Sequence, residues 1–323
     1  MTGIIRSLRK LRAQLRNPRP AIIMYHRVAS VETDPWGLSV SPSNFQAQIA
    51  ALQRRHLVLS TEDFIDQARR GTIASNAVTI TFDDGYLDNL TNAAPILANA
   101  KLPATLFLAT HIAEQGASYW WDVLASTVLD TPPVTGSVII GNESVFIQLG
   151  VREPADDRRL NWRAWEPRTA REQLHYQLWN RIRPLDSDGI AAALLSLNEV
   201  FGPVTMELPR AMRLDEVAQL IATAPFTLGG HTNDHADLVT LPAEMVLNQI
   251  VDGRDVVRQI AGNDPAGFAY PYGSHNHFAC AAVEAAGFTW ACTTHHGHVS
   301  TAPDLYRLPR ITAQDVANIS WLV

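Results

Sequence analysis

Two adjacent aspartates stand directly after a run of β-forming residues. Asp83 and Asp84 follow the stretch VTITF and precede Gly85. Adjacent carboxylates raise each other's pKa, whereas a divalent cation offsets the repulsion and keeps both ionised. One aspartate could therefore bind a metal while the other takes a proton from an attacking water. The alternative is a plain turn, in which Asp and Gly are common.

A second group with chemical potential is a histidine pair. His231 and His235 follow the stretch FTLGG and are four residues apart. On a helical turn this spacing presents both imidazoles to one point, as a divalent metal needs. Two histidines and one carboxylate with open positions are typical of a hydrolytic metal site, whereas structural sites are closed, usually by thiolates. Two surface histidines are the alternative, but the Asp-Asp-Gly on another strand end favours the metal site.

The elements that carry these residues alternate between strands and helices. We predict strands over 21–26, 57–60, 76–82, 104–110, 226–230, 267–272 and 288–294, with helices between most of them. This alternation indicates a parallel sheet with helices outside it, and six to eight strands favour a closed or nearly closed barrel. In such a barrel the carboxyl ends of all strands lie on one face. The polar clusters at 83–85, 231–235 and 271–273 are therefore predicted to meet.

A long break interrupts this pattern between residues 112 and 209. It contains a hairpin-like segment with a turn at Gly141-Asn142, and five of the eight tryptophans, namely Trp120, Trp121, Trp162, Trp165 and Trp179. We expect an insertion with its own small core, which lies at one end of the strands and could form a lid. The alternative is a peripheral decoration whose tryptophans pack only against its own helices.

Composition and charge limit the class of protein. The chain has 323 residues, is 46% hydrophobic and 18% charged, and carries a formal net charge of −6. Residues 1–20 hold six basic side chains and no acid, so the remainder is acidic and does not resemble a nucleic-acid binder. We divide the chain into a basic amphipathic leader (1–19), a barrel (20–312) interrupted by the 112–209 insertion, and a C-terminal tail (313–323).

The leader and the cysteines bear on location. Residues 1–19 could lie on an anionic membrane surface or form a solvated helix. They lack the apolar core of a signal peptide, and the chain has no apolar run long enough to span a bilayer. Cys280 and Cys292 are too few for a disulfide scaffold. We expect a cytoplasmic protein, with peripheral contact at the inner face of the membrane as an option.

The motifs TFDDG, HTNDH and YPYG, in that order, resemble the first three motifs of the polysaccharide deacetylase family, carbohydrate esterase family 4. The segment MYHRV near the start resembles one found in many bacterial members. The resemblance covers residues 20–110 and 210–312. It implies an α/β fold, a distorted (β/α) barrel of about seven parallel strands. It also implies one divalent metal ion, for which we favour zinc over cobalt or nickel, and hydrolysis of an N-acetyl group on an amino sugar.

Residue roles follow from the same resemblance. It implies that Asp83 is the general base and that a backbone N–H of Tyr272 binds the oxyanion. The metal ligands that it implies are Asp84, His231 and His235.

Two family features are missing from the sequence. Where the third motif normally begins with an arginine that pairs with the base, this chain has Ala269, and we expect Arg310 to reach in from another strand. The last motif, a Leu-x-x-x-His strand that supplies the general acid, is absent. We rank His296, in TTHHGHVS, and His26, at the end of the first strand, as its replacements.

We therefore expect a metal-dependent N-deacetylase of cell-surface or exopolysaccharide biosynthesis. The predicted substrate is an amino-sugar glycan or a nucleotide- or lipid-linked sugar, and no nucleic-acid partner is expected. Two alternatives stay open: a deformylase acting on an N-formyl sugar, and a non-catalytic carbohydrate-binding relic of the same fold. An intact set of two aspartates and two histidines argues against the relic.

Overall fold

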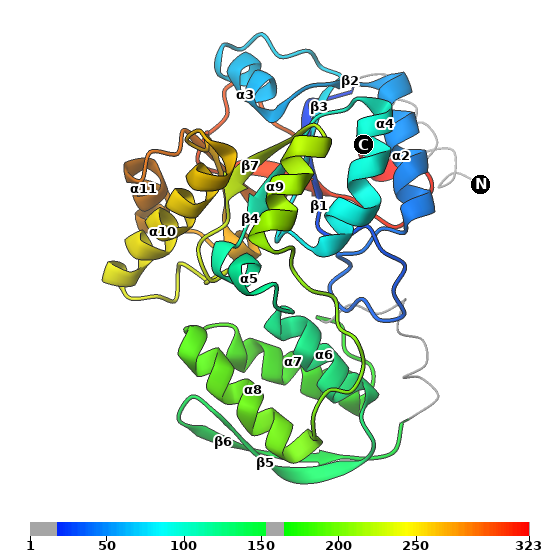
Figure 1. Cartoon of the computed structure of the whole chain (residues 1–323), viewed down its shortest axis with the longest axis vertical. Helices are drawn as coiled ribbons and strands as arrows, with labels where there is room; N and C mark the ends of the chain where they lie inside the picture. Colours follow the sequence, from blue (N-terminus) through cyan, green and yellow to red (C-terminus); the bar gives the residue numbers. More distant parts are fainter. Residues whose placement is uncertain (1–17, 153–164, 323) are drawn as a thin grey trace, which may run out of the picture.

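The computed structural model describes residues 18–152 and 165–322 (Figure 1). The predicted leader therefore lies almost wholly outside the described residues, as does Trp162. No helix within these two ranges is both long and apolar enough to cross a bilayer.

Seven parallel strands form a closed barrel in the order β1-β10-β9-β8-β7-β4-β3, and pairing of β1 with β3 closes it. The seven-stranded parallel barrel predicted from the sequence is thereby confirmed. A short strand, β2 (Leu57–Val58), pairs with β3 outside the ring. The barrel strands are β1 (Ala21–Tyr25), β3 (Ala77–Phe82), β4 (Ala104–Leu108), β7 (Phe226–Gly230), β8 (Gly267–Ala269), β9 (Trp290–His296) and β10 (Leu308–Thr312).

Helices surround the barrel (Figure 1). They are α2 (Pro42–Arg55), α3 (Thr61–Arg69), the π turn η1 (Asn89–Ala93), α4 (Ala94–Ala100), α9 (Leu214–Thr223), α10 (Ala243–Ala261) and α11 (His277–Ala285). Two short 3-10 turns, η4 (Pro271–Gly273) and η5 (Ser320–Leu322), complete this part. Because side chains alternate along each strand, one set points outward to the helices and the other inward.

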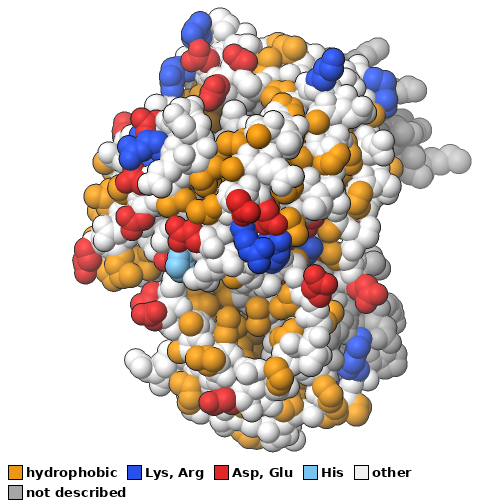
Figure 2. All heavy atoms as spheres, in the orientation of Figure 1, with side chains coloured by type: hydrophobic (Ala, Val, Ile, Leu, Met, Phe, Trp, Pro, Cys, Tyr) orange, Lys and Arg blue, Asp and Glu red, His pale blue; other side chains and the backbone are white. Residues whose placement is uncertain are grey.

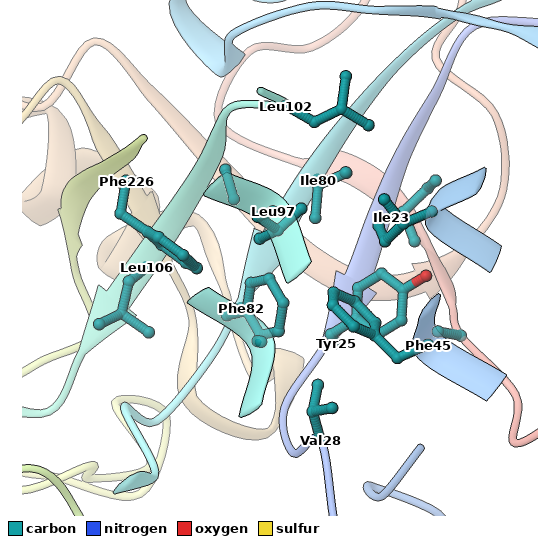
Figure 3. Packing of buried hydrophobic residues seen from close by; sticks show 14 of the residues in the cluster. Ile23, Tyr25, Val28, Phe45, Ile80, Phe82, Leu97, Leu102, Leu106 and Phe226 are labelled. Carbon is teal, nitrogen blue, oxygen red and sulfur yellow. The ribbon is translucent and has the colours of Figure 1, made fainter. Parts of the chain in front are cut away.

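The outward set forms the larger core. Tyr25 of β1 stacks on Phe82 of β3 with ring centroids 5.3 Å apart, and its edge meets Phe45 of α2 at 5.1 Å (Figure 3). The segment predicted as a C-terminal tail also packs here, since Trp321 and Leu322 are buried in the same cluster. The final residues of the described chain therefore help to cover the barrel.

The insertion forms a second lobe below the barrel (Figure 1). It follows α5 (Thr110–Gln115) and comprises α6 (Trp120–Asp130), the antiparallel hairpin β5 (Val134–Ile140) and β6 (Glu143–Leu149), α7 (Ala170–Ile182) and α8 (Ser187–Phe201). It has its own hydrophobic cluster, as expected from the sequence. Figure 2 shows many hydrophobic and few charged side chains on this lobe, whereas most charges on that face lie over the barrel.

Candidate active site

The carboxyl ends of β3, β7 and β8 deliver the motif residues to one face of the barrel. Asp83 and Asp84 directly follow β3, and His231 directly follows β7. Asp84 adopts a left-handed backbone with φ of 72°, a conformation that is uncommon for residues other than glycine. Gly85 has φ of 84°, and a Cβ there would lie 2.6 Å from a methyl carbon of Leu108. Glycine at this position therefore allows the strand to turn sharply behind Asp84.

Asp84, His231 and His235 form a buried group. Each residue offers one ligand atom, and these three atoms lie within 4.8 Å of one another. Asp84 Oδ1 is 3.4 Å from His231 Nε2 and 3.2 Å from His235 Nε2. Burial opposes ionisation of Asp84, but the two imidazoles outweigh it and lower its pKa. Two imidazole nitrogens and one carboxylate oxygen are a donor set that suits a divalent metal such as zinc.

Two further contacts support a fit to a metal. His231 Nδ1 lies 2.7 Å from the carbonyl oxygen of Ala269, so the proton of the neutral imidazole is assigned to Nδ1, which leaves Nε2 able to bind a metal. Asp84 Oδ1 is buried and forms no hydrogen bond within the described part of the chain. A buried carboxylate oxygen is normally satisfied, so a cation would complete this group.

The local backbone around the histidines differs from the expected helical turn. Residues 231–235 form a loop, in which Thr232 and His235 have positive φ of 64° and 56°. Thr232 Oγ1 accepts a hydrogen bond from the backbone N–H of Ala236 and closes the loop. The prediction of a helical turn was wrong because two left-handed residues, rather than helical spacing, bring the imidazoles together.

Asp83 is held by a buried arginine from β10, which is separated from β3 in the ring only by β1. The Nη1 and Nη2 atoms of Arg310 donate to Asp83 Oδ1 and Oδ2 at 2.7 and 2.6 Å, and its Nε donates to the carbonyl oxygen of Thr293. Burial opposes ionisation of Asp83, but the guanidinium outweighs it and the pKa is lowered. Asp83 is thus an ionised carboxylate fixed beside the Asp84 group. Arg310 supplies the positive charge that is missing from the third motif, where this chain has Ala269.

A cavity of about 330 Å³, the catalytic cavity hereafter, opens onto both aspartates and both histidines. Five large aromatic side chains also line it: Trp36 from the segment after β1, Tyr272 from η4, and Trp121, Trp165 and Trp179 from the insertion. The tryptophans of the insertion therefore do more than pack against their own helices. The insertion is one wall of the site.

The sequence model described as Polysaccharide deacetylase matches residues 70–137 and 202–291, which hold both motif groups. The chain belongs to the polysaccharide deacetylase family. Between the two matched ranges lies most of the insertion, so the family match covers the barrel strands that carry Asp83, Asp84 and the histidines.

Individual relatives agree with the family. A poly-beta-1,6-N-acetyl-D-glucosamine N-deacetylase of Staphylococcus aureus is 37% identical over 79 residues, which are 24% of this chain and 27% of that protein. The match thus spans about a quarter of that relative's length. The Streptococcus pyogenes deacetylase PplD, solved with acetate, covers 93% of this chain and 94% of its own, with TM-score 0.58 and 17% identity. IcaB from Ammonifex degensii covers 94% of each chain, with TM-score 0.57 and 17% identity. Both structures share the deacetylase fold of this chain.

The remaining predicted residues are placed unequally. His26 lines the catalytic cavity, with Nε2 3.8 Å from Asp83 Oδ2. Tyr272 also lines it and has a left-handed backbone with φ of 58°. His296 is exposed near the end of β9 and does not line the cavity. Of the two residues ranked for the missing family histidine, the structure brings only His26 to the site.

The sequence did not reveal that residues at the start of α6 form hydrogen bonds and ring contacts with the motif residues and their neighbours. The Tyr119 hydroxyl donates to the backbone oxygen of Asp84. Trp121 Nε1 donates to the Tyr86 hydroxyl at 2.8 Å, and that hydroxyl donates to Asp122 Oδ2 at 2.8 Å. The Trp121 ring centroid also lies 4.7 Å from that of His235. The visible signal was the density of hydrogen-bonding aromatics in YWWD, directly at the start of the insertion.

Arg183, at the end of α7, is a second residue that the sequence did not single out. Its guanidinium lies 3.1 Å from Asp237 Oδ2 and over the rings of Trp179 and Tyr272, at 5.1 and 5.4 Å from their centroids. Asp237 is buried two residues beyond His235, so this pair ties the insertion to the histidine loop.

Proposed function

We propose that the chain is a metal-dependent hydrolase that removes the N-acetyl group from an amino sugar of a cell-surface or exopolysaccharide glycan. The observation that carries this proposal is the pairing of two buried groups in one cavity. One is an ionised carboxylate, Asp83, held by Arg310. The other is the Asp84, His231 and His235 donor set, which lies at the same strand ends.

The proposed base is Asp83. Arg310 engages both of its oxygens, yet each oxygen keeps a second lone pair that can accept a proton from the attacking water. The arginine also fixes the orientation of the carboxylate and keeps it ionised. A divalent metal held by Asp84, His231 and His235 would lower the pKa of that water and polarise the amide carbonyl.

Two more residues have proposed roles, one at the leaving amine of the substrate and one at its carbonyl oxygen. His26 would donate the proton to the leaving amine, since it lines the cavity beside Asp83. The backbone N–H of Tyr272 would stabilise the developing oxyanion. The left-handed backbone at Tyr272 turns the chain at the cavity wall, where such a donor is needed.

Aromatic walls support a sugar as the substrate. The apolar face of a pyranose ring can pack against Trp121, Trp165 or Trp179, while its hydroxyls meet the polar groups of the cavity. A nucleotide- or lipid-linked amino sugar remains within this proposal. Action at the inner face of the membrane stays a prediction, because residues 1–17 lie outside the described part of the chain.

The deformylase alternative uses the same base and metal group and differs only in the acyl pocket. The relic alternative was raised by the missing arginine and the missing final histidine motif. The pairing of Arg310 with Asp83 argues against the first reason, and the proposed role of His26 would answer the second. We therefore keep deacetylation first and treat the choice of acyl group as an outcome of the assay.

The test measures acetate and formate released from N-acetyl- and N-formylglucosamine oligosaccharides by the zinc-loaded chain. We expect acetate release, reduced about 10²- to 10⁴-fold in Asp83→Asn, as for loss of a general base. The matched control is Asp188→Asn, an exposed aspartate on α8, which should retain wild-type rates. Formate release alone would favour the deformylase, and release of neither acid would refute the proposal.

A further inference from the structure

A second and larger cavity, of about 570 Å³, adjoins the catalytic cavity. It is lined by the segment 27–39, by the start of α6 and by residues 206–210. The two cavities share three lining residues, Trp36, Leu38 and Trp121. The two cavities therefore meet at these side chains, and a chain of sugars bound along this shared wall would reach from one cavity into the other.

The shared wall is suited to sugar rings. Trp36 and Trp121 line both cavities, and the Trp121 ring is held in place by stacking on Tyr119 with centroids 4.4 Å apart. Trp36 Nε1 is buried and donates no hydrogen bond within the described part of the chain. An unused indole N–H beside an aromatic face can donate to a sugar hydroxyl, and a buried donor left unpaired costs free energy.

The charge of the second cavity is negative. Five acidic side chains line it against two basic ones, Arg27 and Arg210. Both arginines are already paired with carboxylates: Arg27 with Asp88 at 3.0 Å, and Arg210 with Glu216, outside the cavity, at 2.7 Å. Burial raises the pKa of Asp122 to about 7, so the excess of negative charge rests on Glu32, Asp34 and Glu207, the last of which also lies near Arg210.

The remaining acidic residues of the cavity differ in whether their carboxylates already accept hydrogen bonds from the protein. The Asp34 carboxylate accepts the backbone N–H groups of Leu38 and Ser39, so it also orders its own loop. Asp122 accepts the Tyr86 hydroxyl. Glu32 and Glu207 are exposed on different lining segments, and the side chain of neither forms a hydrogen bond within the described part of the chain. These last two can meet a cationic ligand at little cost and can be changed without disturbing the fold.

We propose that the second cavity binds the sugar next to the one being deacetylated, and that it favours a sugar with a free amine. An ammonium group fits the excess of carboxylates, and the shared tryptophans fit the sugar ring. This inference rests on the proposed function and deepens it. The preferred substrate is a glycan in which the neighbouring residue has already lost its acetyl group, so that one deacetylation favours the next.

The test is a binding measurement that needs no turnover. The probes are a glucosamine disaccharide and its fully N-acetylated counterpart, each titrated calorimetrically into the zinc-loaded chain. We expect the glucosamine disaccharide to bind more tightly, and Glu32→Gln with Glu207→Gln to weaken it roughly three- to tenfold, as for loss of two solvent-exposed charges. Binding of the acetylated disaccharide should change less than twofold. The matched control carries Glu62→Gln and Glu199→Gln, two exposed acids outside the cavity.

Equal affinity for the two disaccharides, or equal loss of affinity for both in the cavity variant, would overturn the inference. Its failure differs from failure of the proposed function. Acetate release without preference for the free amine would refute only the second-cavity proposal. Preferential binding of glucosamine without any acyl release would refute only the hydrolase.

Discussion

The pairing of Arg310 with Asp83 can be tested through stability, because both side chains are almost completely inaccessible to solvent, at 0% and 2% exposure. Arg310→Met removes both hydrogen bonds to the carboxylate and leaves Asp83 buried, with His26 Nε2 at 3.8 Å in place of a guanidinium. Breaking a buried ion pair in this way costs about 3–5 kcal/mol, because the remaining charge stays desolvated. Arg310→Lys keeps a cation but loses the two-pronged geometry, so a smaller loss is expected.

Urea denaturation followed by tryptophan fluorescence, with a chelator present so that metal binding does not contribute, measures this loss. Asp83→Asn in the Arg310→Met background removes the unpaired buried charge. The loss of free energy of unfolding in the double variant should therefore be smaller than the sum of the losses in the two single variants. Arg258→Met is the matched control. Its guanidinium pairs with Asp255 at 48% exposure, and its loss should cost less than about 1 kcal/mol. An Arg310→Met variant no less stable than this control would refute the reasoning.

Further predictions concern the site and one surface pair. Asp83→Asn should retain bound metal while hydrolysis falls, whereas Asp84→Ala should lose both, as metal analysis and acetate release would show; metal loss in the first variant would contradict the division of roles. His26→Gln should lower kcat about 10²-fold or more with metal content unchanged, and an unchanged kcat would remove it as the acid. Hydrogen bonds from Arg210 lower the pKa of Glu216 to about 2, so this pair stabilises the fold above the ordinary glutamate pKa and loses its effect as the pH falls toward 2. Glu216→Gln should therefore cost about 1 kcal/mol in urea denaturation at pH 7 and less at pH 3; an equal cost at both would refute the linkage.

The barrel and its motif residues could be predicted because their signals are local. A β-run that ends in Asp-Asp-Gly, and another that ends in a histidine pair, identify strand ends. Parallel strands then place these ends on one face. The same alternation indicated a barrel of six to eight strands, although it counted 57–60, which forms β2 outside the ring, and did not include β10.

Contacts between distant segments were harder to predict. Arg310 was expected near Asp83 only because the family position at Ala269 lacks an arginine, and spacing alone does not indicate that β10 enters the ring beside β1. His296 was ranked with His26 because both follow strands on the correct face. The last three residues of β9, Thr294, His295 and His296, are all exposed, however, and the sequence does not reveal where this strand leaves the buried part of the barrel.

The loop of the histidines and the role of the insertion depend on tertiary structure. Helical spacing suggested the right pair of ligands for the wrong backbone, because left-handed residues such as Thr232 carry no clear sequence signal. The hydrogen bonds of Trp121 and Tyr86 appear only once α6 is docked against the barrel. That the insertion supplies a wall of the cavity could be suspected from its tryptophans but not assigned.

Metal content is the most direct test of the central claim, that Asp84, His231 and His235 hold a catalytic metal. Protein purified without chelator, and then incubated with zinc or cobalt and desalted, should contain about one divalent ion per chain, as one such donor set binds one ion. The variant with His231→Ala and His235→Ala should contain none, while a variant with His111→Ala, a partly exposed histidine outside the site, should match the wild type. A wild-type chain that takes up neither metal would contradict the account.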